Sequence, residues 1–293
     1  MKVVIPAAGL GSRFLPATKT QPKEMLPIVD RPIIHYVVAE AVASGADDIL
    51  IVTGRGKRAL EDYFDVSPEL AAWKHHPALI ELEELARKAR IHFVRQREPR
   101  GLADAISCAR HHTGGEAFGV LLGDTINLCE PPLLRQLWRW YEELGSSVIA
   151  VEPVPRASVA NYGIVQGRRM RPGLLRCERL IEKPDPARAP SRLAITGAYV
   201  VTPEIYGMID RTRPGINGEV QLTDALNRLA QTTEVYAARF QGERFDIGNP
   251  MLWLRANLDL AWRRPELRAR LRPVVRAISQ NRAPSKRTSR ART

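Results

Sequence analysis

A loop of small residues followed by cations lies near the start of the chain, in "PAAGLGSRFLPATKTQPKEMLP" (residues 6–27). The small residues are Ala7, Ala8, Gly9 and Gly11. A ligand can approach the backbone amides of such a loop closely, and these amides form a concavity that binds anions. Arg13 and Lys23 follow, an arginine being able to bind two phosphate oxygens and a lysine acting as a mobile point charge. The pattern suits a triphosphate from which pyrophosphate leaves, the alternative being a surface turn with solvated cations.

Two other phosphate-binding patterns do not fit this loop. The dinucleotide fingerprint G-x-G-x-x-G requires a third glycine where this chain has Phe14. The prolines Pro16, Pro22 and Pro27 would also prevent the long helix that must start there. The Walker pattern is absent as well, because "TGRGKRA" has the wrong spacing. The loop therefore argues against a hydride-transfer enzyme and against a Walker-type phosphate site.

Two aspartates that follow strand-like runs could hold a metal ion. Asp124 stands in "GVLLGDTIN" and Asp246 in "RFDIGNP". A triphosphate normally brings Mg²⁺, which prefers one or two protein carboxylates and several waters. Each aspartate alone would more often be a helix cap or a turn residue. The prediction of an Mg²⁺ site therefore depends on whether the two carboxylates meet in space.

Strand-like and helical patterns alternate along the chain. The strand-like runs are "KVVIPAA", "DILIVTG", "IHFVRQ", "AFGVLLGD", "SSVIAVEPV", "YGIVQG", "LLRCERLIEK" and "LAITGAYVV". Helical spacing occurs between them, for example in "LLRQLWRWYEEL" before Gly145. This alternation predicts an α/β fold with a mostly parallel mixed central sheet flanked by helices. With no linker-like stretch, we expect one catalytic domain over residues 1–275, including C-terminal helices from about residue 250.

Charge is distributed unevenly along the 293 residues. The net charge is +12, but 11 Lys or Arg and one Glu from Arg263 onward contribute +10, so the rest is nearly neutral. Residues 276–293 contain six basic residues and little apolar material, and we expect a disordered basic tail. Because no apolar run reaches the roughly 18 residues of a membrane span and no secretory signal is present, we expect a soluble cytoplasmic protein without membrane contact.

Four long blocks of the sequence resemble the bacterial sugar nucleotidyltransferases, and among these the enzymes that use UTP. The blocks are "PAAGLGSRFLPATKTQPKEMLPIVDRPII", "TGRGKRALEDYFD", "NGEVQLTDAL" and "FDIGNP". The resemblance covers residues 2 to about 260. It implies a Rossmann-like nucleotidyltransferase fold of the glycosyltransferase A type, and UTP and glucose 1-phosphate as substrates.

The resemblance also implies roles for individual residues. Uracil would contact Ala8, Gly9, Gln96 and Gly101, with Gly11 and Asp124 also on the nucleotide. The catalytic cations would be Arg13 and Lys23 on the triphosphate and Lys183 on the sugar phosphate. The sugar would contact Tyr162, Gly163, Glu182 and Gly197. Mg²⁺ would be held by Asp124 and Asp246.

The implied chemistry is an in-line attack of glucose 1-phosphate on the α-phosphorus of UTP. The nucleophile is already an ionised phosphate, so positioning and charge neutralisation suffice and no general base is expected. A homodimer or homotetramer is implied by the family, and apolar residues of the C-terminal helices would serve as the contact.

Two alternatives stay open at this stage. Gly123 before the metal aspartate is more like the glucose-1-phosphate thymidylyltransferases, which use dTTP, whereas "KEMLP" favours the UTP enzymes. A protein from another class, a non-catalytic scaffold with a polyanion-binding tail, would use the basic tail for weak electrostatic contacts to nucleic acid. The near-neutral remainder of the chain and the lack of aromatic residues in the tail argue against specific nucleic-acid binding.

Overall fold

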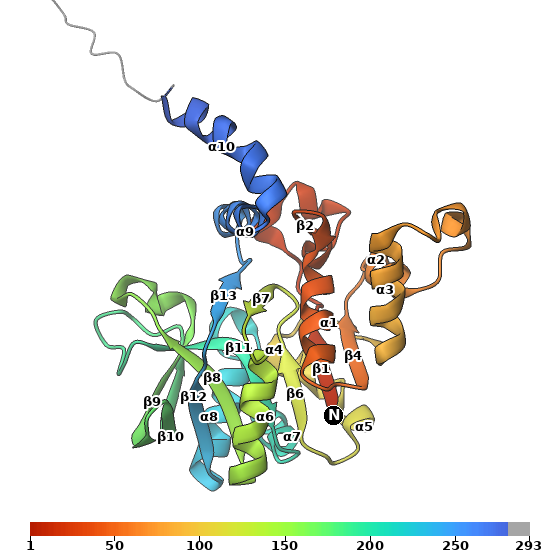
Figure 1. Cartoon of the computed structure of the whole chain (residues 1–293). Helices are drawn as coiled ribbons and strands as arrows, with labels where there is room; N and C mark the ends of the chain where they lie inside the picture. Colours follow the sequence, from red (N-terminus) through yellow and green to blue (C-terminus); the bar gives the residue numbers. More distant parts are fainter. Residues whose placement is uncertain (281–293) are drawn as a thin grey trace, which may run out of the picture.

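The computed structural model of the protein describes residues 1–280, apart from the side chain of Ile216 (Figure 1). A nine-stranded sheet forms its centre. In spatial order the strands are β5 (Arg90–Arg95), β4 (Asp48–Thr53), β1 (Lys2–Pro6), β6 (Phe118–Leu121), β11 (Leu193–Val201), β8 (Ser147–Pro153), β12 (Val235–Arg239), β10 (Leu174–Glu182) and β9 (Gly163–Arg171). All eight strand-like runs of the sequence coincide with strands of this sheet.

The sheet is mixed, with most strands running in one direction. Strands β5, β4, β1 and β6 are mutually parallel, and β8 and β12 are parallel to each other. Strand β11 is antiparallel to β6, β8 and β9, and β10 is antiparallel to β12 and β9. Only β10 and β11 therefore run against the other seven. This confirms the mostly parallel mixed sheet, and it brings the carboxyl ends of β1, β4, β5 and β6 to one edge.

Helices cover both faces of the sheet. Successive residues of a strand point to opposite faces, so an apolar strand has side chains to bury on each side. On β1, Val3 and Ile5 belong to the core beneath α1 (Ile33–Ala43) and α6 (Leu133–Leu144). Val4 belongs to the second core, beneath α4 (Leu102–Ser107), α7 (Ile205–Asp210) and α8 (Leu222–Thr232). Helix α6 ends before Gly145, as its sequence predicts, and this glycine has the φ of 63° of a left-handed helix cap.

Shorter elements surround the sheet. They are the two-stranded ladders β7 (Thr125–Leu128) with β13 (Glu243–Asp246) and β2 (Pro27–Ile28) with β3 (Arg31–Pro32), and the helices α2 (Ala59–Phe64), α3 (Pro77–Lys88) and α5 (Arg110–Thr113). The opening loop contains three 3₁₀ turns, Ser12–Phe14, Ala17–Lys19 and Lys23–Met25. This loop therefore contains no long helix, in agreement with its prolines.

The C-terminal helices are α9 (Pro250–Arg263) and α10 (Pro265–Gln280), and α10 projects from the body of the molecule (Figure 1). The helical part continues five residues beyond the boundary expected at residue 275. The rest of the basic tail, residues 281–293, lies outside the described residues. No helix within residues 1–280 is long and apolar enough to cross a membrane.

Candidate functional site

A cavity of about 400 Å³ lies at the carboxyl edge of the parallel strands. It contains all six residues assigned to the nucleotide, together with Lys23: Ala8, Gly9, Gly11, Lys23, Gln96, Gly101 and Asp124. These residues come from the segments that follow β1, β5 and β6. The carboxyl edge is where open α/β folds bind their ligands. The residues are thus brought together although up to 116 positions separate them (Ala8 and Asp124).

Glycines give the loops of this cavity their shape. Gly11 has a φ of 68°, and its carbonyl accepts a hydrogen bond from Thr18 at 2.7 Å, which closes the loop on itself. Gly101 has a φ of 113°, and a Cβ there would lie 2.7 Å from the carbonyl oxygen of Val220. A side chain at either position would be strained. The block "NGEVQLTDAL" therefore packs directly against the start of α4.

Lys23 and Asp124 form an ion pair in the cavity, with 2.5 Å between Nζ and Oδ2. Both side chains are about four-fifths buried. Burial alone would lower the pKa of Lys23 and raise the pKa of Asp124. The attraction between the two charges outweighs burial, so the pKa of Asp124 is lowered and the pKa of Lys23 is raised, the latter with a contribution from Glu24. Both groups are charged at neutral pH, so a cation and a carboxylate lie side by side in the cavity.

A second ion pair lies behind the first. Nζ of Lys57 donates to both carboxylate oxygens of Glu24, at 2.9 and 2.7 Å, and the two side chains are 7% and 1% exposed. Burial raises the pKa of Glu24 and lowers the pKa of Lys57, and their mutual attraction opposes both effects. Because Glu24 directly follows Lys23, the buried pair anchors the turn from which Lys23 reaches the cavity.

The ladder between β7 and β13 brings the two predicted metal ligands to adjoining positions. Asp246 pairs with Thr125, and the backbone amide of Ile247 donates to the carbonyl of Asp124 at 3.0 Å. Asn249 then caps α9 by accepting from the amides of Met251 and Leu252. The loop of "FDIGNP" is therefore held at both ends, by a strand and by a helix cap.

Two carboxylates suit a magnesium ion, which needs few protein ligands, better than a metal ion whose ligands all come from the protein. No group of three or more His, Cys, Asp or Glu side chains within residues 1–280 could hold a metal. Mg²⁺ needs only one or two carboxylates when phosphate oxygens and waters complete its shell. Arg13 reaches the loop that follows Asp246 and donates to the carbonyl of Gly248 at 3.3 Å. The donor set is thus suitable for a metal that arrives with a triphosphate.

Arg244 orders the surroundings of Asp246. Its side chain is 7% exposed, its Nε donates to Glu152 at 2.8 Å, and its guanidinium lies over the ring of Tyr162, 5.3 Å from the centroid. The hydroxyl of Tyr162 donates to Oδ2 of Asp246 at 3.0 Å, and Arg244 lies 3.5 Å from the same oxygen. Burial, with the charge of Asp246 second, raises the pKa of Tyr162, so its hydroxyl stays a donor.

The residues assigned to the sugar lie on the antiparallel side of the site. Glu182 accepts from the hydroxyl of Thr223 at 2.6 Å, and a Cβ on Gly163 would lie 2.6 Å from that hydroxyl oxygen. Lys183 has a φ of 44° and pairs with Glu182 at 3.3 Å. A left-handed conformation is uncommon for lysine and is frequent at functional sites.

Gly197 joins the two halves of the site. It has a φ of 87°, and its carbonyl accepts from the amide of Leu122, which lines the nucleotide cavity. A Cβ at Gly197 would lie 2.7 Å from a methyl carbon of Leu122. The assigned sugar and nucleotide residues are therefore linked through β11 and the end of β6.

Gly123 does not line the cavity. A Cβ at this position would lie 3.1 Å from the carbonyl oxygen of Pro6 and 3.3 Å from Cγ of Glu24. The glycine thus lets β1, the Glu24 turn and Asp124 pack closely, which explains it without reference to the base.

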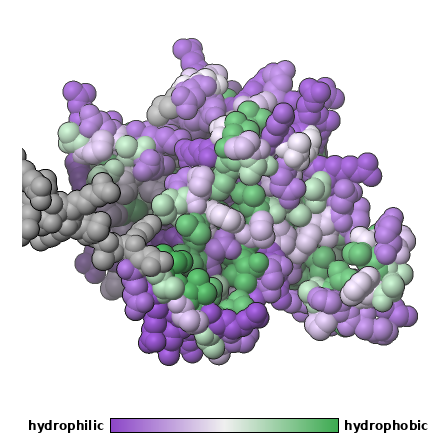
Figure 2. Space-filling view, turned by 90° about the horizontal axis from the view of Figure 1, so that it is seen from above, coloured by the Kyte–Doolittle hydropathy of each residue, from purple (hydrophilic) through white to green (hydrophobic). Residues whose placement is uncertain are grey.

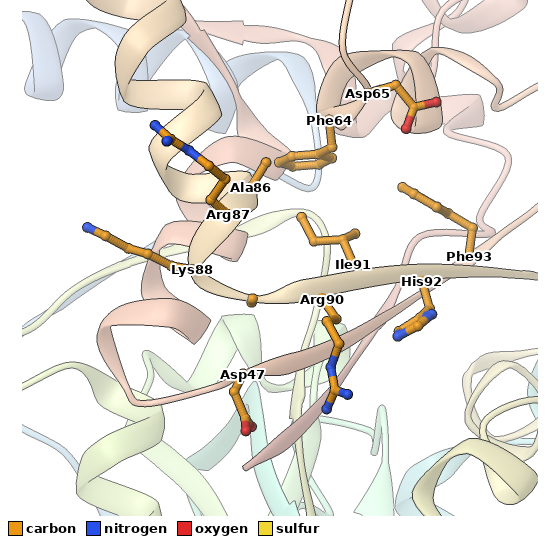
Figure 3. Close-up of a pocket in the computed structure, with 11 residues that line it drawn as sticks. Asp47, Phe64, Asp65, Ala86, Arg87, Lys88, Arg90, Ile91, His92 and Phe93 are labelled. Atoms are coloured by element: carbon orange, nitrogen blue, oxygen red, sulfur yellow. The ribbon is translucent and has the colours of Figure 1, made fainter.

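A separate cavity of about 530 Å³ lies between the end of α3 and the edge strand β5 (Figure 3). The charged side chains of Arg87 and Lys88 extend to one side there and Arg90 points in another direction, while Phe64 and Phe93 face its interior. None of the residues assigned to a site lines it. Its geometry does not converge on a ligand, so the cavity at the carboxyl edge is the better candidate.

Sequence reasoning missed four groups that organise the site: Glu24, Lys57, Arg244 and Asp104, the last of which accepts a hydrogen bond from Nε2 of Gln96 at 2.6 Å. The sequence did contain a signal for Arg244. Residues two apart on a strand share a face, and Arg244 stands two positions before Asp246. Glu24 and Lys57 lie 33 positions apart, and nothing in their spacing indicates that they meet. Asp104 stands in the first turn of α4, where an acidic residue is common anyway.

Comparisons with known proteins find a matching family and similar proteins of known name. Residues 2–262 match the nucleotidyl transferase family. A protein of Bacillus subtilis (strain 168) named UTP–glucose-1-phosphate uridylyltransferase is 46% identical over 286 residues, which cover 94% of this chain and 96% of that protein.

Two solved structures are also similar. A UDP-glucose pyrophosphorylase complexed with UDP-glucose is 39% identical, with a TM-score of 0.86, and the match covers 90% of this chain and 99% of that one. A UTP-bound UGPase from Acinetobacter baumannii is 35% identical, with a TM-score of 0.83, over 94% of this chain and 98% of that one.

Proposed function

The chain belongs to the nucleotidyl transferase family, and from this we propose that it forms UDP-glucose and pyrophosphate from UTP and glucose 1-phosphate. The observation that carries the proposal is the cavity in which Lys23 and Asp124 meet beside a loop of small residues. A triphosphate with its metal ion requires two things: a loop that admits the base, and a cation that lies beside a carboxylate.

The reaction is a single displacement at phosphorus. A phosphate oxygen of glucose 1-phosphate attacks the α-phosphorus of UTP, the bond from that phosphorus to the bridging oxygen breaks, and pyrophosphate leaves with the electron pair. Because the nucleophile is already anionic, no side chain must remove a proton from it. The protein has to bring two polyanions together and to balance their charge.

Arg13 and Lys23 bind the triphosphate in this proposal. Lys23 separates from Asp124 and turns its ammonium toward the phosphate oxygens, where negative charge increases as pyrophosphate leaves. Glu24 stays beside Lys23 and keeps that ammonium charged. Ala8, Gly9 and Gly11 let the nucleotide approach the backbone, and Gln96 and Gly101 contact the base.

Glucose 1-phosphate binds on the side of β10 and β11. Glu182 accepts hydrogen bonds from the sugar hydroxyls, and Lys183 binds the phosphate. Tyr162, Gly163 and Gly197 complete the sugar pocket, the two glycines by allowing a close approach. Asp124 and Asp246 would hold Mg²⁺, which when bound neutralises charge on the phosphates.

UTP is the better candidate than dTTP. The relatives over most of the chain are named for UTP and UDP-glucose. The residue that kept dTTP open, Gly123, lies behind the cavity and has a packing reason.

Self-association through α9 is a further part of the proposal. Four apolar side chains at helical spacing are 39–71% exposed on this helix: Met251, Leu254, Leu258 and Trp262. Figure 2 looks down on the end of the molecule that carries α9 and α10, and hydrophobic residues form patches among hydrophilic ones there. Contiguous exposed apolar residues mark protein interfaces. Light scattering during size exclusion, compared for wild type and Leu258→Asp, tests a homodimer or homotetramer.

The activity itself is tested by supplying the protein with UTP, glucose 1-phosphate and MgCl₂ and measuring pyrophosphate and UDP-glucose. We expect equal amounts of both products, and no pyrophosphate when either substrate is left out or when EDTA removes the metal. If no pairing of UTP, dTTP, CTP or ATP with common sugar 1-phosphates gave turnover, the proposed function would be wrong.

A further inference from the structure

The side-chain amide of Gln96 is held in one orientation by two acceptors. Gln96 follows β5, is 5% exposed and lines the nucleotide cavity. Its Nε2 donates to Oδ2 of Asp104 at 2.6 Å and to the carbonyl of Gly101 at 3.2 Å. A carboxylate and a carbonyl can only accept. The amide atom that faces both must therefore be the nitrogen, because an oxygen there would repel both partners.

The other amide atom, Oε1, is left as an acceptor. Within residues 1–280, no hydrogen bond to Gln96 Oε1 accompanies the two bonds made by Nε2. A ligand in the cavity consequently meets an acceptor at Gln96 and needs a donor of its own. Uracil has such a donor at N3 (N3–H), whereas cytosine has an acceptor at N3 and carries its donor on the neighbouring 4-amino group. An acceptor at Gln96 therefore distinguishes the two bases when N3 is the ring atom that faces it.

We propose that Asp104 is a positioning residue that sets base specificity by holding Gln96 with its acceptor toward the base, which selects uracil over cytosine. This inference rests on the proposed function, since it concerns the nucleotide of the same site. Asp104 acts through Gln96 and does not line the cavity.

Asp104 is the stronger of the two partners that orient the amide. Its contact to Nε2 is short and made to a carboxylate, and bonds of this kind are roughly twice as strong as bonds between neutral groups. The Gly101 bond is longer and neutral. If the Asp104 carboxylate is removed, turning the Gln96 amide over costs only the weaker hydrogen bond, the one to Gly101. The preference for one orientation should then fall by about tenfold or more.

An acidic residue in the first turn of a helix also has an ordinary explanation, because it interacts favourably with the helix dipole. The experiment must therefore separate base selection from helix stability. The matched control is Asp62→Asn, since α2 and α4 are both six-residue helices with an aspartate in the first turn.

The test measures kcat/KM for UTP and for CTP, with saturating glucose 1-phosphate, in wild type, Asp104→Asn, Asp104→Ala and Asp62→Asn. Circular dichroism and thermal melting establish that each variant is folded. Asp104→Ala serves as the second variant, since alanine suits a helix and removes the side-chain acceptor completely. We expect the UTP-to-CTP ratio to fall about tenfold or more in both Asp104 variants, and to stay at the wild-type value in Asp62→Asn.

The inference would be overturned if the Asp104 variants kept the wild-type UTP-to-CTP ratio, even with both rates lowered equally, because that result describes a structural role alone. An equal fall of the ratio in Asp62→Asn would overturn it as well. Failure of the proposed function is a different result: wild type itself would not turn over UTP.

Discussion

The buried pair of Lys57 and Glu24 gives a sharp prediction about stability. Both carboxylate oxygens of Glu24 are bonded to Lys57, and Glu24 is 1% exposed, so Lys57→Met leaves a buried carboxylate without its main partner. Breaking such a pair from one side costs about 3 to 5 kcal/mol. For a chain of this size, that corresponds to a melting temperature lower by roughly 6 to 20 °C.

The double variant Lys57→Met with Glu24→Gln should recover most of this loss, because replacing both charges removes the unpaired group. Arg58→Met is the matched control: its pair with Asp62 is exposed and should contribute about 1 kcal/mol or less. Differential scanning calorimetry measures all four proteins.

The pH dependence of the Lys57→Met deficit has a definite sign. With its partner gone, buried Glu24 takes a pKa above its ordinary value of 4.5, so the folded state keeps a proton that the unfolded state loses. The deficit should therefore be smallest at pH 4.5 and grow as the pH rises. A melting temperature of Lys57→Met within about 2 °C of wild type, or a double variant no more stable than the single one, would refute the reasoning.

Two further predictions concern Glu40 and Arg244. Burial raises the pKa of Glu40 to about 7, against a hydrogen bond from Asn127. Because the unfolded state ionises from pH 4.5 upward, wild type should lose roughly 3 kcal/mol between pH 4.5 and 7. Glu40→Gln should avoid this loss, so its melting temperature relative to wild type rises over that range; a pH-independent difference would contradict the assignment. Arg244→Met should weaken Mn²⁺ binding to the UTP complex by about 10- to 100-fold in electron paramagnetic resonance titrations. Unchanged Mn²⁺ affinity would show that Arg244 does not order Asp246.

Local patterns predicted most of the fold. Buried strands such as β1 and β4 are continuously apolar, and the Gly145 cap of α6 is a short-range signal, so the sequence contains both directly. The β7–β13 ladder was not predictable in this way. It joins Thr125 to Asp246 across 121 positions, and this long-range pairing places Asp246 beside the segment that contains Asp124, the other predicted metal ligand.

The candidate site was predictable where residues are close in sequence or belong to a distinctive block. The residues assigned to the nucleotide come from such blocks, and in the structure they line one cavity. The groups that hold them in place were not found. The ion pair of Glu24 with Lys57 and the contact of Asp104 with Gln96 depend on side-chain positions that arise only in the folded chain.

The central claim is that Lys23 stabilises the leaving pyrophosphate, and it is tested most directly by kcat for Lys23→Ala with UTP and glucose 1-phosphate. Removing one electrostatic donor of this kind costs about 2.7 to 4 kcal/mol, a fall of about 100- to 1,000-fold. Lys19→Ala is the control, since Lys19 belongs to the same loop and is exposed. We predict that Lys23→Ala loses activity on this scale with an intact fold while Lys19→Ala does not. A folded Lys23→Ala enzyme within a few-fold of wild type would contradict the account.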